Sequence, residues 1–196
     1  MNTRKLSTRM LVSCGMLAAV AFVLQYIEFS IPIMPSFIKL DLSDLPEIIG
    51  AFAFGPVAGV IIALVKNLIH LPFGSTGGVG ELSNFILGAV FAASAGAFYQ
   101  RGKSKKTALI GGIIGAAAMA VVSLPSNYFI VYPVYYNFMP KEVIVQAYQA
   151  IFPGVNSIFS CLLVFNVPFT LVKGLLCVLV AMLIYKPLSP ILKGRK

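Results

Sequence analysis

The chain has 196 residues, of which 59% are hydrophobic and 11% charged, and its mean hydropathy is +0.92. A soluble domain is about one quarter charged, so this composition excludes a disordered chain and argues against a soluble enzyme or a nucleic-acid-binding module. The net charge of +9 is then a matter of membrane topology rather than of an anionic partner, and the length suits one integral membrane domain, residues 1–196, with six spans of about 20 residues.

Turn residues and charges divide the chain into six apolar segments, which predicts an all-α, polytopic bundle with both termini on one side. The expected helices cover residues 8–28, 44–55, 56–71, 81–99, from 107 to 123 or beyond, and from between 155 and 167 to 185. A Pro-rich loop, residues 31–44, joins the first two, and Ser43 or Asp44 is suited to cap the second. The apolar run from residue 10 to 26 exceeds the about 7 to 15 residues of a signal-peptide core, so we interpret it as a permanent span.

Basic residues gather in three segments that a six-span arrangement places on one side of the membrane. Eleven of the 15 Lys and Arg residues lie there: Arg4, Lys5, Arg9, Arg101, Lys103, Lys105, Lys106, Lys186, Lys193, Arg195 and Lys196. The opposite loops carry Lys39 and Lys141 beside acidic residues. Because Lys and Arg accumulate in cytoplasmic loops, this pattern predicts a multi-pass protein of the cell membrane with both termini in the cytoplasm.

Two cations, Lys66 and Lys173, lie inside apolar spans. A lysine at the bilayer centre costs about 2.5 to 3.5 kcal/mol, so each must face a cavity or a partner. Lys173 precedes Lys186 by 13 residues and Asn127 follows Lys106 by 21, which at the rise of an α-helix is about 20 Å and about 30 Å above the cytoplasmic boundary. Both belong to the outer half of the membrane, which predicts a polar pocket open to the outside.

An aromatic segment, residues 123–136, surrounds Asn127 and holds four of the eight tyrosines. It fits either an interfacial aromatic belt or the wall of a pocket for a flat ligand. In the second interpretation the tyrosines offer stacking faces, the Asn127 amide offers donors and an acceptor, and Lys173 offers a fixed cation. That combination suits a heteroaromatic ring with carbonyl edges.

Several other features are weak indications of chemistry. The segment Gly102-Lys103-Ser104 resembles the end of a P-loop, but Ala97 stands where the first glycine is needed and no strand precedes it. His70, the single histidine, fits a hydrogen-bonded helix end better than a catalyst, because no nucleophile and acid accompany it. Glu28, Glu47 and Glu81 can form a proton path, but they more simply cap helices or meet Lys66.

The first helix contains a pair of small residues, and the three cysteines lie in apolar segments. Gly15 and Ala19 form a pair with the spacing that allows close helix approach, either within the chain or against a partner. Cys14, Cys161 and Cys177 lie in apolar runs without metal-ligand spacing, so they are expected to be buried hydrophobes and no metal site is predicted.

The block from Phe37 to Gly59, continuing to Lys66-Asn67-Leu68, resembles the riboflavin-binding S component of energy-coupling-factor (ECF) vitamin transporters. Shorter matches follow in the same order: Glu81-Leu82-Ser83-Asn84, Ser126-Asn127-Tyr128-Phe129 and Pro168-Phe169-Thr170-Leu171-Val172-Lys173-Gly174. The resemblance implies a six-helix bundle that binds riboflavin from outside, beneath a lid formed by the loop between the first two helices.

The resemblance also implies which residues bind the ligand. On the matched motifs these are Leu40, Asp41, Asn84, Asn127, Tyr128, Thr170 and Lys173. Thr170 stands where the family pattern has Asn, so it offers one hydroxyl in place of an amide. No cofactor is implied, since riboflavin is the transported ligand.

The implied partners are a transmembrane coupling subunit and two ABC-type ATPases, with Gly15 and Ala19 at the docking face of the first helix and the lipid bilayer around the bundle. The chain is then no enzyme, because the partners hydrolyse ATP. The alternatives are an S component for another vitamin, such as thiamine or pantothenate, a stand-alone proton-coupled carrier, and an intramembrane enzyme that uses His70.

Overall fold

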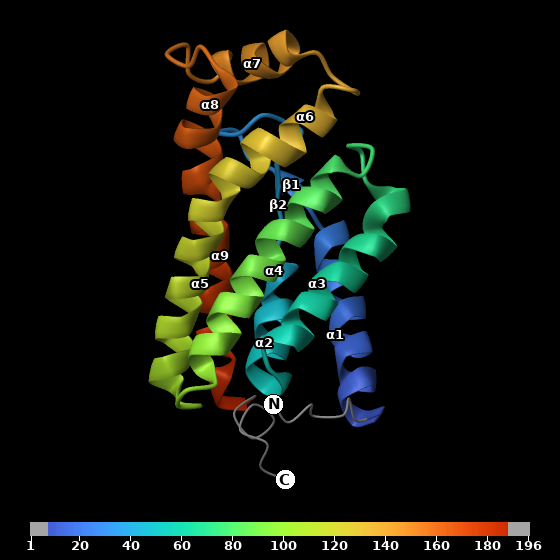
Figure 1. Cartoon of the computed structure of the whole chain (residues 1–196), viewed down its shortest axis with the longest axis vertical. Helices are drawn as coiled ribbons and strands as arrows, with labels where there is room; N and C mark the ends of the chain where they lie inside the picture. The colour runs from blue at the N-terminus through green and yellow to red at the C-terminus, as the bar shows by residue number, and fades with distance from the viewer. Residues whose placement is uncertain (1–7, 188–196) are drawn as a thin grey trace.

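The computed structural model describes residues 8–187 and shows a bundle of long helices capped at one end by short elements (Figure 1). The main helices are α1 (Thr8–Tyr26), α2 (Asp44–Phe54), α3 (Pro56–His70), α4 (Val79–Tyr99), α5 (Lys105–Ser126) and α9 (Val167–Leu183). The short elements are β1 (Phe29–Ser30), β2 (Lys39–Leu40), η1 (Leu71–Phe73), η2 (Asn127–Val131), α6 (Tyr132–Tyr135), α7 (Lys141–Gln149), α8 (Ile158–Cys161) and η3 (Leu162–Asn166). The helical fold class predicted from the sequence is therefore confirmed for these residues.

Four continuous segments in the described part of the chain are long and apolar enough to cross a membrane. They are Pro56–Phe73, Val79–Tyr99, Lys105–Tyr135 and Ile158–Leu183. The apolar part of α1, Met10–Tyr26, is shorter, and α2 has 11 residues and lies in the middle of the bundle, with most of its side chains buried. The length criterion thus supports four spans, and the expected count of six stays a prediction.

The fifth and sixth expected helices extend through π-helical turns. The chain runs from α5 through η2 into α6, past Pro125, and from α8 through η3 into α9, whose first turn contains Pro168. A proline removes one helical hydrogen bond, and a π turn absorbs the extra residue without ending the helix. For this reason the fifth helix continues well beyond Ser123.

Sharp turns join the other helices. Gly55 has φ +105°, a conformation that side chains disfavour, and it reverses the chain between α2 and α3, where Pro56 begins the next helix. Before α5 the Ser104 hydroxyl accepts from the backbone N–H of Thr107 at 3.1 Å, and the Thr107 hydroxyl accepts from that of Ser104 at 2.9 Å. The segment that resembles a P-loop therefore contains a helix cap.

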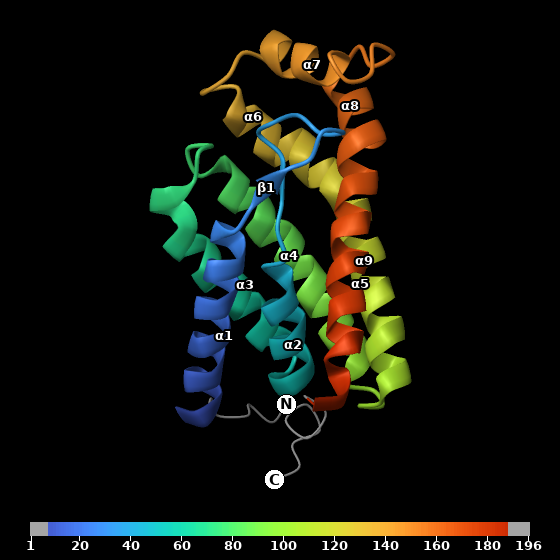
Figure 2. The same cartoon turned by 180° about the vertical axis from the view of Figure 1, so that it is seen from behind.

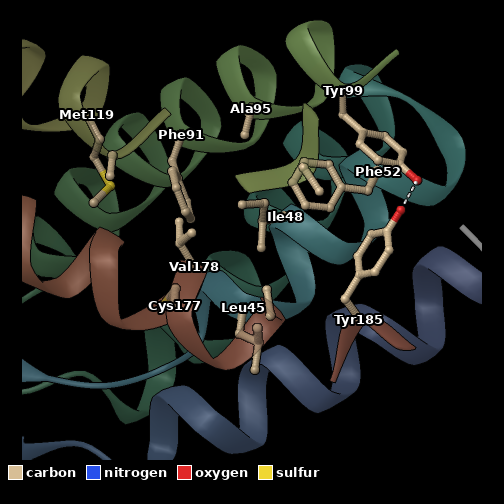
Figure 3. Close-up of a cluster of buried hydrophobic side chains, with 13 residues drawn as sticks. Leu45, Ile48, Phe52, Phe91, Ala95, Tyr99, Met119, Cys177, Val178 and Tyr185 are labelled. Atoms are coloured by element: carbon tan, nitrogen blue, oxygen red, sulfur yellow. Dashed lines mark hydrogen bonds between the residues drawn. The ribbon is translucent and has the colours of Figure 1, made fainter. Parts of the chain in front are cut away.

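Close packing of α2, α4, α5 and α9 forms the main core (Figure 3). The labelled side chains are Leu45, Ile48, Phe52, Phe91, Ala95, Tyr99, Met119, Cys177, Val178 and Tyr185, and the hydroxyls of Tyr99 and Tyr185 lie 3.3 Å apart. Gly111 and Gly115 of α5 bring that helix against the backbone of α4, because a Cβ at either position would lie 2.8 Å from a carbonyl oxygen of α4. Cys14, Cys161 and Cys177 are buried free thiols, as expected.

The two ends of the bundle differ in charge and in structure. The start of α1, the α4–α5 turn and the end of α9 lie together at one end in both views (Figures 1 and 2). That turn carries Arg101 and Lys103, and Lys186 follows α9. The opposite end holds the β1–β2 hairpin, the α3–α4 loop and α6–α8. Arg4, Lys5, Lys193, Arg195 and Lys196 lie outside the described residues.

Candidate functional site

A pocket enters the bundle at the end that carries the β1–β2 hairpin. The space free of protein atoms in the pocket and at its open mouth, solvent included, is about 1000 Å³. Its walls come from the end of α1, the hairpin loop, the α3–α4 loop, α4, the η2–α6 segment, η3 and α9. The pocket therefore joins segments that lie far apart in the sequence, and its opening toward the outside stays a prediction.

Four of the predicted binding residues line this pocket: Asn84, Asn127, Thr170 and Lys173. They come from α4, η2 and α9, and the last three are buried. Asp41 does not line the pocket, but its carboxylate forms an ion pair with Lys173.

The side chains of Leu40 and Tyr128 are not part of the pocket wall. Leu40 belongs to β2, next to Lys39, which does line the pocket. Tyr128 is 40% exposed and packs edge-on against Phe129 and Phe159, with ring centroids 5.0 and 5.9 Å away.

Lys173 is held at the pocket wall by acidic and amide oxygens. Its Nζ lies 2.9 Å from Asp41 Oδ2 and 3.4 Å from both Asp44 Oδ2 and Asn84 Oδ1. Asp41 also accepts the backbone N–H of Ser43 at 2.7 Å, which fixes the carboxylate. The ammonium is thus kept charged and in place inside an apolar bundle.

Lys66 is completely buried and forms the second half of the same ionic network. Its Nζ lies 2.9 Å from Asp44 Oδ1, 2.6 Å from Glu47 Oε1 and 2.5 Å from Ser43 Oγ. Ser43 precedes α2 but makes no capping hydrogen bond, because its hydroxyl accepts from Lys66 instead. Asp44 bridges the two lysines, so both intramembrane cations have the partners that the sequence predicted.

Asn127 and Thr170 present polar atoms that the protein leaves available. Ser83 Oγ donates to Asn127 Oδ1 at 3.0 Å, which leaves the Asn127 amide N–H groups for a ligand. Thr170 is 5% exposed and its hydroxyl makes no hydrogen bond within the described residues. Asn127 begins the π turn η2, a distortion that is frequent at functional sites.

A hydrogen-bonded group that the sequence did not predict lies at the hairpin end of the bundle. The Tyr132 and Tyr148 hydroxyls lie 2.5 Å apart, and Tyr148 donates to Asn166 Oδ1 at 2.6 Å. Burial raises the pKa of Tyr148, so its phenol stays a neutral donor. Tyr132 and Tyr135 line the pocket while Tyr128 faces outward, so the aromatic segment serves both as pocket wall and as outer surface.

A second hydrogen-bonded group, only partly predicted from the sequence, lies on the far side of the pocket, near α1. His70 Nδ1 lies 2.8 Å from Glu81 Oε1, and Gln25 Nε2 donates to Asn67 Oδ1 at 3.1 Å. His70 is thus a hydrogen-bonded helix end, as expected. Gln25 carried no sequence signal, because its importance depends on a contact with a residue 42 positions away.

The described part of the chain contains no group of three or more His, Cys, Asp or Glu side chains placed to hold a metal ion. An open pocket lined by polar and charged side chains, within a bundle of apolar helices, is typical of a membrane protein that binds a small solute. Residues 9–185 match the family described as the substrate-specific component of ECF transporters, and the chain belongs to this family. Members of this family are substrate-binding components of transporters, not enzymes.

Known relatives agree with this assignment. The riboflavin transporter RibU of Staphylococcus aureus (strain TCH60) is 37% identical over 183 residues, which cover 93% of this chain and 92% of that protein. The riboflavin transporter FmnP of Bacillus subtilis (strain 168) is 29% identical over 188 residues, 94% of each chain. A solved structure described as the S component of a bacterial ECF transporter has 37% identity and a TM-score of 0.74, covering 94% of this chain and 98% of its own.

Proposed function

We propose that this chain captures riboflavin outside a bacterial cell and delivers it inward when docked on an ATP-driven ECF coupling module. The observation that carries the proposal is the set of Asn127, Thr170 and Lys173 on one wall of the pocket. Their donors suit the carbonyl edge of an isoalloxazine ring, and the apolar side chains of Leu87 and Phe169 offer faces for the ring. The riboflavin transporters among its relatives support the same ligand.

The loop between α1 and α2 then acts as the lid of the site. Two antiparallel pairs, Phe29 with Leu40 and Ser30 with Lys39, close the base of this loop. Phe37 and Ile38 of the loop line the pocket, and the Phe37 ring packs edge-on against Tyr135 and Tyr148 at 5.6 and 5.9 Å. Release of these aromatic contacts would open the pocket outward.

A flavin titration of the purified full chain in detergent tests the ligand. Riboflavin is expected to bind at one site and lose fluorescence, because Tyr132 and Tyr135 line the pocket, while thiamine and pantothenate leave the signal unchanged. If thiamine or pantothenate stabilised the protein and riboflavin did not bind, the substrate would be another vitamin. Uptake by proteoliposomes that contain this chain alone, driven by a proton gradient, would favour a stand-alone carrier.

The docking face in this proposal is the outward side of α1. Gly15 and Ala19 are exposed, and a Cβ at Gly15 meets nothing within 4 Å, whereas Ala18 and Ala21 are buried against the bundle. Small exposed residues allow another helix to approach closely. Gly15→Leu should abolish copurification with a coupling subunit and its two ATPases while riboflavin binding is retained, and an intact complex would remove this face from the interface.

A further inference from the structure

The pocket residue Asn166 is held by a tyrosine that lies outside the pocket. Asn166 stands between η3 and α9, lines the pocket and is 8% exposed. Thr170 and Lys173, which line the same pocket, follow it by four and seven residues. Residues at this spacing share one face of a helix, so the three side chains form a polar stripe at the start of α9.

The tyrosine is Tyr148 of α7, a short helix that lies across the hairpin end of the bundle beside α6 and α8 (Figures 1 and 2). Tyr148 is completely buried and does not line the pocket. Its ring packs against Phe37 of the α1–α2 loop and Phe165 of η3, with ring centroids 5.9 and 5.1 Å away. These contacts fix the ring and thereby the position of its hydroxyl next to Asn166.

The direction of the hydrogen bonds follows from their lengths. The Tyr148 hydroxyl oxygen lies 2.6 Å from Asn166 Oδ1, a distance typical of an O–H···O contact and shorter than the about 2.7–3.2 Å of an N–H···O contact. Asn166 therefore turns its carbonyl oxygen toward Tyr148, and the hydroxyl donates. Since a hydroxyl has one proton, the Tyr132 hydroxyl, 2.5 Å away, must donate to Tyr148 in turn.

The Asn166 amide nitrogen is consequently the group left for the pocket. Among the described residues its one hydrogen-bond partner is the Tyr132 hydroxyl oxygen at 3.5 Å, which is beyond the usual range for such a bond. An amide nitrogen carries two N–H groups, so at least one of them has no acceptor in the described part of the chain. A buried donor without an acceptor is costly, and here the ligand can supply the acceptor.

We propose that Asn166 donates a hydrogen bond to an acceptor of the flavin ring, and that Tyr148 is the positioning residue that keeps the Asn166 amide in this orientation. The inference rests on the proposed function, in which the ring lies on the Thr170 and Lys173 side of the pocket. Thr170 offers a hydroxyl and Lys173 an ammonium, and Asn166 adds a carboxamide to the same stripe. The carbonyl oxygens and ring nitrogens of a flavin are acceptors of the required kind.

Flavin titrations of the full chain in detergent test the Asn166 contact. Asn166→Leu keeps the size and branching of the side chain and removes the donor, so riboflavin should bind about tenfold more weakly. Lumiflavin, which has a methyl group in place of the ribityl chain, should lose the same factor because the contact is to the ring. Wild-type affinity in Asn166→Leu, or a loss confined to riboflavin, would overturn the inference.

A double variant tests the positioning role of Tyr148. Tyr148→Phe keeps the ring contacts and releases the amide, which should weaken both flavins about three- to tenfold. It also tests the proposal independently of whether Asn166→Leu folds. In the Asn166→Leu background, Tyr148→Phe should cause no further loss, because no amide remains to be oriented. A hydroxyl that only stabilises the fold would reduce the affinity by the same factor in both backgrounds, and that result would contradict the positioning role.

Tyr26→Phe is the matched control, since it removes a hydroxyl from an exposed tyrosine at the end of α1 that does not line the pocket. Its flavin affinities should equal those of the wild-type chain. If the wild-type chain binds riboflavin and both Asn166→Leu and Tyr148→Phe bind it equally well, the inference fails while the proposed function stands. Failure of the wild-type chain to bind either flavin would overturn the proposed function together with it.

Discussion

At the scale of single residues, Asp44 bridges two lysines that we expect to have different roles. Asp44 contacts both Lys66 and Lys173, yet Lys173 lines the pocket while Lys66 is sealed between α2 and α3. We therefore expect Lys173, and not Lys66, to exchange part of its coordination for a ligand oxygen. Substitution of Lys173 should affect ligand binding, and substitution of Lys66 should affect stability.

Lys173→Ala should weaken riboflavin binding more than tenfold, because a charge-assisted hydrogen bond contributes about 1.5–3 kcal/mol. The variant also leaves Asp41 without its cation, which adds to the loss. Fluorescence titration measures the effect, and Lys141→Ala, an exposed position on α7, is the matched control. Unchanged affinity in Lys173→Ala would exclude this lysine from the site.

Lys66→Met should lower the thermal unfolding midpoint by roughly 10 °C, since removal of one partner from a buried ion pair costs about 3–5 kcal/mol. The stranded carboxylates are Asp44 and Glu47. Adding Glu47→Gln should restore part of the loss, because fewer buried charges remain unpaired. A thiol-reactive fluorophore reports unfolding through the three buried cysteines. Equal midpoints for wild type and Lys66→Met would contradict a stabilising pair.

The sequence predicts a role for those residues whose charge is unfavourable in their surroundings. Lys66 and Lys173 are charges in apolar helices, so they predict partners without knowledge of the fold. Gln25, Tyr148 and Asn166 are unremarkable in isolation, and their roles arise from contacts between distant segments. No local pattern encodes such contacts, which explains why these residues were missed.

At the scale of elements, the helix ends at Gly55, His70 and Tyr99 were predicted within a residue or so, because turn residues mark them. The short elements between Tyr132 and Cys161 were not predicted. There the chain mixes aromatic and polar residues without a helical period, and its structure depends on packing of α6, α7 and α8 over the pocket.

Helix contact at α4–α5 should depend on Gly115. A Cβ there would lie 2.8 Å from the Phe91 carbonyl oxygen and 3.0 Å from the Ala95 Cβ, so Gly115→Ala forces the two helices apart and should lower the unfolding midpoint. Overpacking of this kind costs about 1–3 kcal/mol. Gly15→Ala, in open space on α1, should leave the midpoint equal or slightly higher because Ala favours a helix. Equal behaviour of the two variants would contradict close packing at Gly115.

At the scale of the whole molecule, charge and pocket lie at opposite ends. The α4–α5 turn holds Arg101, Lys103, Lys105 and Lys106, whereas the pocket opens at the hairpin end. Because cations accumulate on the cytoplasmic side, this polarity predicts that the pocket mouth faces outward, as capture of an external solute requires.

Cysteine labelling in intact cells tests that orientation. A cysteine placed at Glu142 on α7 should react with a membrane-impermeant maleimide from outside, and one at Lys105 in the first turn of α5 should react after the membrane is permeabilised. Both positions are exposed, and the native thiols are buried, so the background from Cys14, Cys161 and Cys177 should be low. The reverse pattern would turn the pocket toward the cytoplasm, where an importer would meet its solute after transport instead of before it.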